Sequence, residues 1–178
     1  GSGDRLLETL QILKQTRDHY KNEVDIRVYL STAGEQVIKW YKLYDNLKQN
    51  VEKIQVDRGP NSPFLAGDLQ LRKYDFLLIA PATSNTVAKI AHGIGDTLLC
   101  NSAIMALKAS VPVYIMPTDH KEGKVTTQLP NGRKLQLRIR KEDAENTKKL
   151  SNIEGIHVLK HPKDIPKIFK KHLQQKTP

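Results

Sequence analysis

The amino-acid sequence predicts a doubly wound α/β fold, in which helices cover both faces of a parallel β-sheet, on three observations. Two continuous apolar runs, residues 75–80 and 111–116, each stop at a proline, as strands buried on both faces often do. Segments whose apolar residues recur at helical spacing lie between the strand candidates. A hairpin pattern near the carboxyl terminus then interrupts this alternation. We therefore expect parallel crossover units that carry one inserted β-hairpin.

Three further strands and five helices complete the expected fold. Residues 25–30 are β-branched and aromatic, residues 51–56 form a weaker strand candidate, and residues 156–159 form the last one. Helical spacing of apolar residues begins at Leu6, Leu7, Leu10 and Leu13 and recurs at residues 35–47, 87–92, 102–109 and 164–173. Strands that alternate with helices in this way favour one sheet, so we expect a single domain over residues 1–178.

The hairpin is expected within an insertion at about residues 121–150. Residues 124–129 and 134–140 are strand candidates, and Asn131-Gly132 between them is a preferred turn dipeptide. Residues 142–150 then form a polar helix. We treat this stretch as an insertion between two strands of the sheet rather than as a separate domain.

The composition limits the classes of partner and compartment. Lys and Arg number 29 and Asp and Glu number 19, so the chain has a net charge of +10. This excess favours an anionic partner, although a solvated lysine-rich surface explains it equally well. Aromatic residues make up only 6%, without a stacking platform or nucleic-acid motif, so a basic nucleic-acid-binding module is the weaker alternative. We expect no nucleic-acid partner.

Cysteine usage and hydropathy indicate a cytoplasmic protein. Cys100 is the only cysteine, so the chain cannot form an internal disulfide or a four-thiolate cluster. No apolar run approaches the roughly 20 residues that span a bilayer, and the first residues do not look like a signal peptide. We expect no membrane attachment and no metal site.

Polar side chains follow the strands at the edge where open parallel sheets bind their ligands. Ser31 and Thr32 follow the strand at residues 25–30, and Pro117-Thr118-Asp119-His120 follows the strand at 111–116. Thr83, Ser84, Asn85 and Thr86 place four small polar side chains where a helix begins behind a buried strand. A helix start of this kind binds a phosphate or a carbonyl-rich ring. An ordinary N-cap is the alternative, but it needs only one such residue.

The same loop carries a family resemblance. The run Ala80-Pro-Ala-Thr-Ser-Asn-Thr-Val-Ala-Lys-Ile-Ala91, with Gly95-Asp-Thr-Leu-Leu99, resembles the signature of the flavoprotein family that includes phosphopantothenoylcysteine decarboxylase, lantibiotic cysteine decarboxylases and flavin prenyltransferases. This resemblance implies a flavodoxin-like, Rossmann-like sheet, bound FMN and assembly into trimers or larger homo-oligomers.

Stretches along nearly the whole chain are similar to a narrower group, the archaeal archaeoflavoprotein AfpA group with its relative, the dihydromethanopterin reductase flavoprotein. They are Gly1-Ser-Gly-Asp4, Ser31-Thr-Ala-Gly-Glu35, Val37-Ile-Lys-Trp-Tyr-Lys-Leu43, Gly59-Pro-Asn-Ser-Pro-Phe-Leu65 and Asn146-Thr-Lys-Lys-Leu150. In that group a first β-strand precedes the Gly-Ser-Gly loop, which faces the flavin. We therefore expect a strand before Gly1 that this sequence does not contain.

The resemblance also assigns FMN contacts by position. It implies that FMN is bound by Ser2, Gly3, Ser31, Thr83, Ser84, Asn85, Thr86 and Asn101. Thr32, which follows the same strand as Ser31, completes the expected site. Hydroxyl groups and backbone amides suit the phosphate and the ribityl chain, and an amide side chain suits the polar edge of the ring. Trp40, Tyr41, Tyr44 and Phe64 are candidates for walling the ring, or else for core and interface packing.

Two departures from the family exclude the decarboxylase activity. Family decarboxylases carry a histidine shortly before the buried strand, where this chain has Leu65-Ala-Gly-Asp-Leu-Gln70. They also carry an Asn- and Met-bearing substrate motif after the third strand, where this chain has Met116-Pro-Thr-Asp-His-Lys121. Redox chemistry of the flavin remains, with the protein supplying position and electrostatics. We expect no catalytic side chain, although His92 and His120 are placed near the ligand edge for a proton transfer.

The resulting hypothesis is an electron-transfer flavoprotein. The resemblance implies that it accepts electrons from ferredoxin, an acidic protein that complements the basic charge, and passes them to an iron–sulfur flavoprotein. The alternative is a dihydromethanopterin reductase that uses the same FMN, and a flavin prenyltransferase is a weaker alternative. An oxidoreductase or electron carrier is thus favoured over a decarboxylase.

Overall fold

The computed structural model describes residues 3–21, 23–51 and 53–176 and confirms the expected α/β fold with its hairpin insertion. The strands are β1 (Val28–Leu30), β2 (Ile54–Val56), β3 (Leu77–Ala82), β4 (Val113–Pro117), β5 (Gly123–Gln128), β6 (Lys134–Ile139) and β7 (Ile156–Val158). The helices are α1 (Leu6–His19), α2 (Thr32–Trp40), α3 (Tyr44–Gln49), α4 (Leu65–Gln70), α5 (Ser84–Ala91), α6 (Leu98–Lys108), α7 (Lys141–Ser151) and α8 (Ile165–Lys176), with a short 3-10 turn at Pro162–Asp164.

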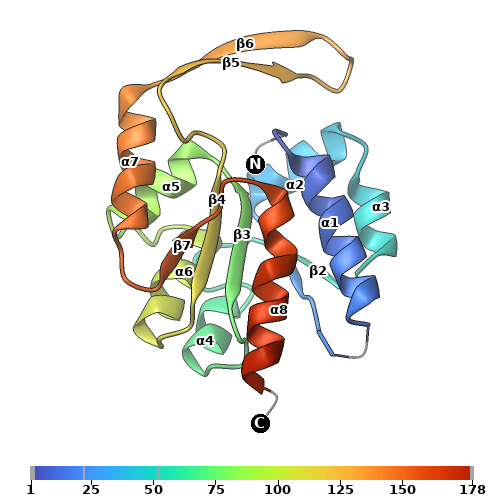
Figure 1. Ribbon diagram of the computed structural model, residues 1–178, viewed down its shortest axis with the longest axis vertical. Coiled ribbons are helices and arrows are strands. Elements are labelled where there is room, and N and C mark those ends of the chain that lie inside the picture. Colours follow the sequence, from blue (N-terminus) through green and yellow to red (C-terminus); the bar gives the residue numbers. More distant parts are fainter. Residues whose placement is uncertain (1–2, 22, 52, 177–178) are drawn as a thin grey trace.

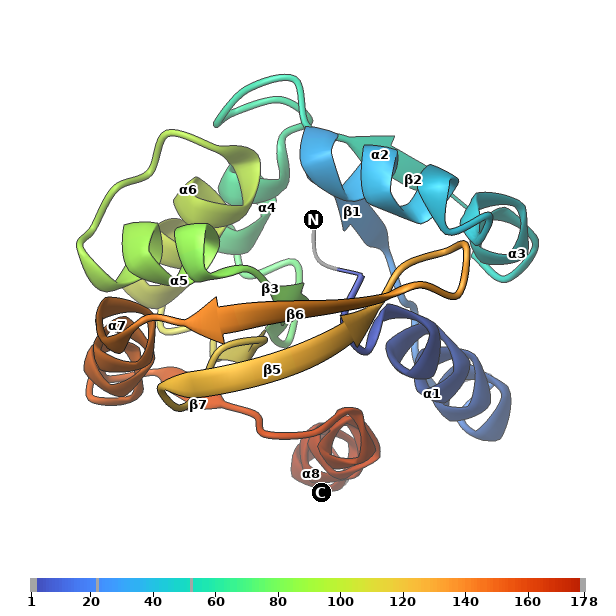
Figure 2. The ribbon, with the colours of Figure 1, turned by 90° about the horizontal axis from the view of Figure 1, so that it is seen from above.

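The parallel strands form two separate sheets. β3, β4 and β7 make a three-stranded parallel sheet in the order β3-β4-β7, and β1 pairs with β2 in a two-stranded parallel sheet. Helices α1 and α8 lie on one face of the larger sheet and α4, α5 and α6 on the other, as Figure 2 shows from above. Because helices cover both faces, β4 is buried along its whole length, which explains its continuous apolar sequence.

Two helices differ from the expectation. Residues 35–47 were expected to form one helix, but the chain forms α2 and α3, because Lys42 between them takes a left-handed backbone conformation with φ of 57°. Glycine usually occupies such a position at a helix end, and lysine rarely does. No sequence signal therefore marks this break. Helix α4 was not expected, because its six residues are too few to show a periodic pattern.

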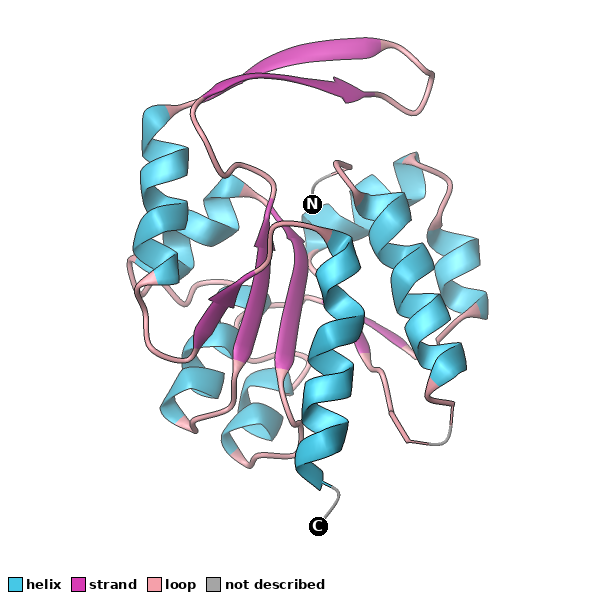
Figure 3. Cartoon of the chain, in the orientation of Figure 1, coloured by secondary structure: helices cyan, strands magenta, loops and turns pink. Residues whose placement is uncertain are grey.

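The hairpin of β5 and β6 extends away from the body, as Figures 1 and 3 show. The expected strand ranges are correct to within one residue at each end, and Gly132 in the turn has φ of 81°, which glycine adopts without strain. Cross-strand pairs place Val125 opposite Leu137 and Thr127 opposite Leu135 on one face. The other face is polar, with Lys124 opposite Arg138 and Gln128 opposite Lys134. The hairpin is therefore amphipathic.

A cavity of about 730 Å³ separates the two parallel sheets. One wall is formed by residues 23–31, which include β1, and the opposite wall by residues 73–81, which include most of β3. Apolar side chains of α1, α4 and α8 cover it above and below, among them Leu10, Leu69 and Phe169. At one point the walls are joined, because the hydroxyl groups of Tyr29 and Tyr74 lie 3.0 Å apart and are hydrogen-bonded.

None of the helices in residues 3–21, 23–51 and 53–176 combines the length and the apolar character that crossing a membrane requires.

Candidate functional site

Two helix N-termini with hydroxyl caps meet at the carboxyl edge of the parallel strands. Ser31, directly after β1, caps α2 and accepts a hydrogen bond from the backbone N–H of Gly34 at 2.9 Å. Thr83, directly after β3, caps α5 and accepts from the backbone N–H of Thr86 at 3.4 Å. The first turn of a helix has N–H groups without intrahelical partners and carries a partial positive charge. Both ends are therefore suited to an anion.

The structure brings Ser31 and Thr86 together as expected. Both side chains line the same cavity between the sheets, and Gly34 and Pro81 line it beside them. The sheet edge explains this proximity, because the carboxyl ends of parallel strands lie side by side although 55 residues separate Ser31 from Thr86 in the chain. A hydroxyl-lined pocket with two helix N-termini is the result.

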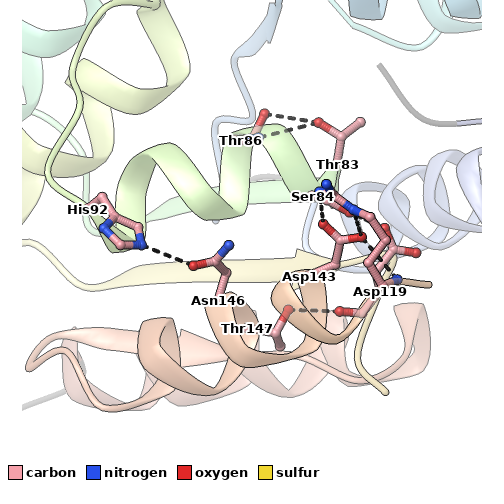
Figure 4. A network of polar contacts seen from close by, with 9 residues as sticks. Thr83, Ser84, Thr86, His92, Asp119, Asp143, Asn146 and Thr147 are labelled. Carbon is pink, nitrogen blue, oxygen red and sulfur yellow. Dashed lines mark hydrogen bonds and ion pairs between the residues drawn. The ribbon is translucent and has the colours of Figure 1, made fainter. Parts of the chain in front are cut away.

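A polar network joins the loop after β3 to the loop after β4, as Figure 4 shows. The hydroxyl of Ser84 donates a short hydrogen bond to the carboxylate of Asp119, and the hydroxyl of Thr147 donates to the backbone carbonyl of Asp119 at 2.8 Å. Helix α7 thus fixes the loop that carries Asp119. A carboxylate beside Ser84 repels an anion there, so the anion-binding end lies on the Ser31 and Thr86 side.

The start of α1 adds a third element to this edge. The Arg5 guanidinium donates to the carbonyl of Lys160, which follows β7, so α1 begins at the carboxyl edge of the sheet. Gly3 lies against the ring of Tyr41, and a Cβ added at Gly3 would come within 2.3 Å of the Tyr41 hydroxyl oxygen. Any larger residue at position 3 would therefore displace the Tyr41 ring.

The other expected site residues are placed less favourably. Thr32 and Asn85 are exposed, and the Thr32 hydroxyl donates to the carbonyl of Asp57 at 3.3 Å. Asn101 is buried in the first turns of α6, where its amide donates to the Pro60 carbonyl at 2.8 Å and to the Asn61 side-chain oxygen at 2.9 Å. Ser2 lies outside the described residues. Asn101 therefore holds the loop after β2, with its carbonyl oxygen as the remaining group for a ligand.

His92 and His120, the two histidines expected near the ligand edge, lie far apart in environment: one ends α5 and the other follows β4. The placement of His92 near the ligand edge is wrong, because His92 ends α5 at the far side from Thr83 and hydrogen-bonds Asn146 of α7 at 3.1 Å. His120 does follow β4, and its Nε2 atom is buried with no hydrogen-bond partner among the described residues. Burial, and then the positive charge of Arg5, lowers the pKa of His120, so its imidazole is neutral at pH 7.

The expected aromatic wall is only partly formed. Trp40 and Phe64 are 58% and 64% exposed, and Tyr44 lies beside the ammonium group of Lys39, 5.0 Å from the ring centroid. Tyr41 faces the hairpin, where its hydroxyl donates to the backbone carbonyl of Gln128 at 3.0 Å. In this monomer the edge that Trp40 and Phe64 provide is open to solvent.

Asp57 is the residue that sequence reasoning missed. Its two carboxylate oxygens accept from the backbone N–H of Gly59 at 2.7 Å and of Leu98 at 3.3 Å. Asp57 thereby shapes the loop after β2 and joins it to the start of α6. Its position directly after a strand was the available signal, but that strand was the weakest candidate in the sequence.

Metal chemistry has no ligand set in this region. Among residues 3–21, 23–51 and 53–176, no group of three or more His, Cys, Asp or Glu side chains is arranged to hold a metal ion.

Comparison with known proteins identifies the family to which the chain belongs. The family model described as Flavoprotein matches residues 4–172. The chain belongs to the flavoprotein family. The matched residues include both loops with hydroxyl caps, at Ser31 and at Thr83. The polar carboxyl edge of the strands therefore lies within the match to the flavoprotein family.

Three relatives of this flavoprotein define its place in the family. It is 49% identical over 176 residues to the uncharacterized protein MJ0730 of Methanocaldococcus jannaschii, covering 99% of this chain and 94% of that one. It is 31% identical to a dihydromethanopterin reductase (acceptor) of the same organism, covering 95% and 92% of the two chains. The crystal structure of Burkholderia xenovorans DmrB in complex with FMN, described as a cubic protein cage for redox transfer, is 29% identical with a TM-score of 0.77, and the match covers 98% of this flavoprotein and 91% of DmrB.

Proposed function

We propose that this flavoprotein binds FMN at the carboxyl edge of its strands and uses it to reduce a dihydropterin of the dihydromethanopterin type. The observation that carries the proposal is the pocket that Ser31 and Thr86 line at the N-termini of α2 and α5. The hydroxyl groups and N–H groups suit the FMN phosphate, which carries two negative charges. Gly3, at the start of α1, packs against the ring of Tyr41 at the same edge.

The arrangement of charges indicates which residues would hold each part of the cofactor. Ser31 and Thr86 would hold the phosphate, on the side away from the carboxylate of Asp119. We expect Thr83, Ser84, Asn85, Thr32 and Gly3 to contact the rest of the cofactor, and Asn101 of α6 to offer it the side-chain oxygen that remains beside the two hydrogen bonds of its amide. The expected contact of Ser2 lies outside the described residues. Bound FMN would supply the redox chemistry, hydride transfer to a carbon–nitrogen double bond of the substrate, with the electrons coming from a donor.

The match to the dihydromethanopterin reductase (acceptor) of Methanocaldococcus jannaschii, which extends over nearly the whole chain, favours the reductase activity. Asp119 offers matching chemistry on the ring side, since a carboxylate accepts two N–H groups from the 2-amino-4-oxopyrimidine edge of a pterin. Electron transfer between proteins, from an acidic ferredoxin to an iron–sulfur flavoprotein, is the second candidate. The redox-transfer role of DmrB and the net charge of +10 favour it.

Self-association belongs to the same proposal. DmrB is described as a cubic cage, and Trp40, Phe64 and Ile94 expose large apolar side chains on this chain. Contact with further copies of the chain covers such side chains. Light scattering on the purified protein is expected to give a mass of three or more chains, and a monomer at micromolar concentration would refute the assembly.

The test of FMN binding compares two helix caps. Thr83→Ala removes the cap of α5 and a hydroxyl group expected to contact FMN, so FMN affinity is expected to fall about 10- to 100-fold. Thr97→Ala removes the corresponding cap of α6, whose hydroxyl accepts from the backbone N–H of Cys100, and it is expected to leave FMN affinity unchanged. Both variants lose about 1 kcal/mol of stability. Fluorescence titration measures the affinity, and equal affinities of the two variants would contradict the site.

The test of the activity is anaerobic turnover. The reduced, FMN-loaded protein is mixed with dihydromethanopterin, and the reoxidation of the flavin is followed by its absorbance. Reoxidation that depends on the pterin is expected for the reductase. Reoxidation only by an iron–sulfur flavoprotein would instead select the electron-transfer candidate.

A further inference from the structure

The hairpin, residues 123–139, carries only positive charge. It holds four basic residues and no acidic residue, a net charge of +4 out of the +10 of the whole chain. The basic residues are Lys124, Arg133, Lys134 and Arg138, and each of them is exposed. Lys121 lies just before β5, whereas Arg140 and Lys141 stand at the start of α7 and are paired there with Asp143 and Glu145. The unopposed positive charge of this region therefore lies on the hairpin.

The hairpin sorts its charges onto one face. Lys124, Lys134 and Arg138 share the polar face with Thr126, Gln128 and Gln136. The apolar face is turned toward the body at Val125, Thr127 and Ile139, which are half-buried. The polar face consequently points away from the body, above the carboxyl edge of the strands in Figure 1. A basic surface thus lies over the proposed FMN site.

The charges on this face are not balanced within the chain. Lys124 lies directly opposite Arg138, and like charges in this position destabilise a hairpin. Arg138 is paired with Glu122 at 3.1 Å, but in the part of the chain that the structure describes Lys121, Lys124 and Lys134 form no ion pair. A local cost of this kind is expected where the charges serve binding.

We propose that the polar face of the hairpin is the docking surface for the electron donor of the flavin, a small acidic one-electron carrier protein. The proposal rests on the proposed function, because either activity requires a donor that reduces the flavin. A protein fits better than a small anion, because the basic residues spread along two six-residue strands, each about 20 Å long. Opposite charge over such an area accelerates encounter and orients the carrier.

The experiment compares two charge-reversal variants of the FMN-loaded protein. The hairpin variant carries Lys124→Glu, Lys134→Glu and Arg138→Glu. The control variant carries Lys108→Glu, Lys163→Glu and Lys170→Glu, three exposed lysines at the end of α6, in the 3-10 turn and on α8. Both variants change the net charge by the same amount, so a difference between them reports the position of the charges.

An acidic plant-type ferredoxin is the probe, and reduced methyl viologen is the small reductant that needs no docking surface. The hairpin variant is expected to slow flavin reduction by reduced ferredoxin about tenfold at low salt and to flatten its salt dependence. The control variant is expected to change this rate less than about twofold, and viologen should reduce both variants at the same rate. Calorimetric titration with oxidised ferredoxin gives a binding measurement that does not depend on activity.

Each of the other outcomes shows which part of the proposal fails. Equal ferredoxin rates for the two variants would overturn the docking surface. A hairpin variant that raises the KM of a pterin with an oligocarboxylate tail, while ferredoxin reduces it normally, would assign the face to the substrate. Failure of the unmodified protein to bind FMN would refute the proposed function, and ferredoxin binding by titration would still test the hairpin.

Discussion

In the three-stranded sheet every residue of β4 is buried, whereas in the two-stranded sheet every residue of β1 and β2 is only half-buried. The two sheets lie on either side of one cavity, and only the larger one has a strand, β4, with neighbouring strands on both sides. The comparison teaches that the larger sheet holds more of the buried core, whereas the candidate site draws on both sheets. Ser31 stands at the end of β1 in the less buried sheet, and Thr83 stands at the end of β3 in the more buried one.

The largest expected difference between the sheets is measured with one substitution made in each. Ile115→Ala removes a fully buried side chain from β4 and is expected to cost about 3 to 4 kcal/mol in the free energy of unfolding. Ile54→Ala removes the same atoms from half-buried β2 and is expected to cost about 1 kcal/mol. Urea unfolding followed by circular dichroism measures both. Similar losses would show that the two sheets are packed equally well.

A smaller effect is expected where the hairpin meets the body. Tyr41→Phe removes the hydroxyl that donates to Gln128, and it keeps the ring beside Gly3. We expect a loss of about 0.5 to 1.5 kcal/mol locally, seen as faster hydrogen exchange in β5 and β6. The matched control is Tyr20→Phe, at the far end of α1 from the hairpin. Unchanged exchange in the hairpin of the Tyr41 variant would contradict this tie.

The smallest effect concerns pH at the end of β4. Burial lowers the pKa of His120 below its value in the unfolded chain, so the folded state favours the neutral imidazole. The stability from this group is complete above the unfolded pKa and is lost as the pH falls through and below that value. The urea midpoint is therefore expected to fall between pH 8 and pH 5, and less so in His120→Asn. Burial also lowers the pKa of His157, so part of the fall remains in that variant. An identical fall in both proteins would remove His120 from the explanation.

Local sequence patterns predicted much of this architecture. Continuous apolar runs predicted β3 and β4, and Asn131-Gly132 predicted the hairpin turn, because buried strands and tight turns each restrict residue type strongly. The proximity of Ser31 and Thr86 followed from the rule for carboxyl edges, although nothing local links them. Their contacts with FMN, together with those of the other expected site residues, remain predictions.

Other features depend on tertiary contacts that no short pattern reveals. The break between α2 and α3 occurs at Lys42, whose backbone conformation is imposed by the surrounding packing rather than by residue type. His92 follows the loop at Thr83 closely in sequence but lies at the opposite end of α5, about 12 Å of helix away from Thr83. The separation of the sheet into two parts also could not be predicted, because each strand candidate was judged without its neighbours.

The exposed hairpin also gives the molecule a defined point of proteolytic attack. Trypsin cleaves after Lys and Arg, and the hairpin offers Lys124, Arg133, Lys134 and Arg138. Its two strands are held by their pairing with each other and by few contacts with the body. The body, with its basic residues mostly on helices, should resist cleavage for longer. A bound carrier protein that covers the hairpin would therefore leave a footprint, visible as slower appearance of two fragments of unequal size.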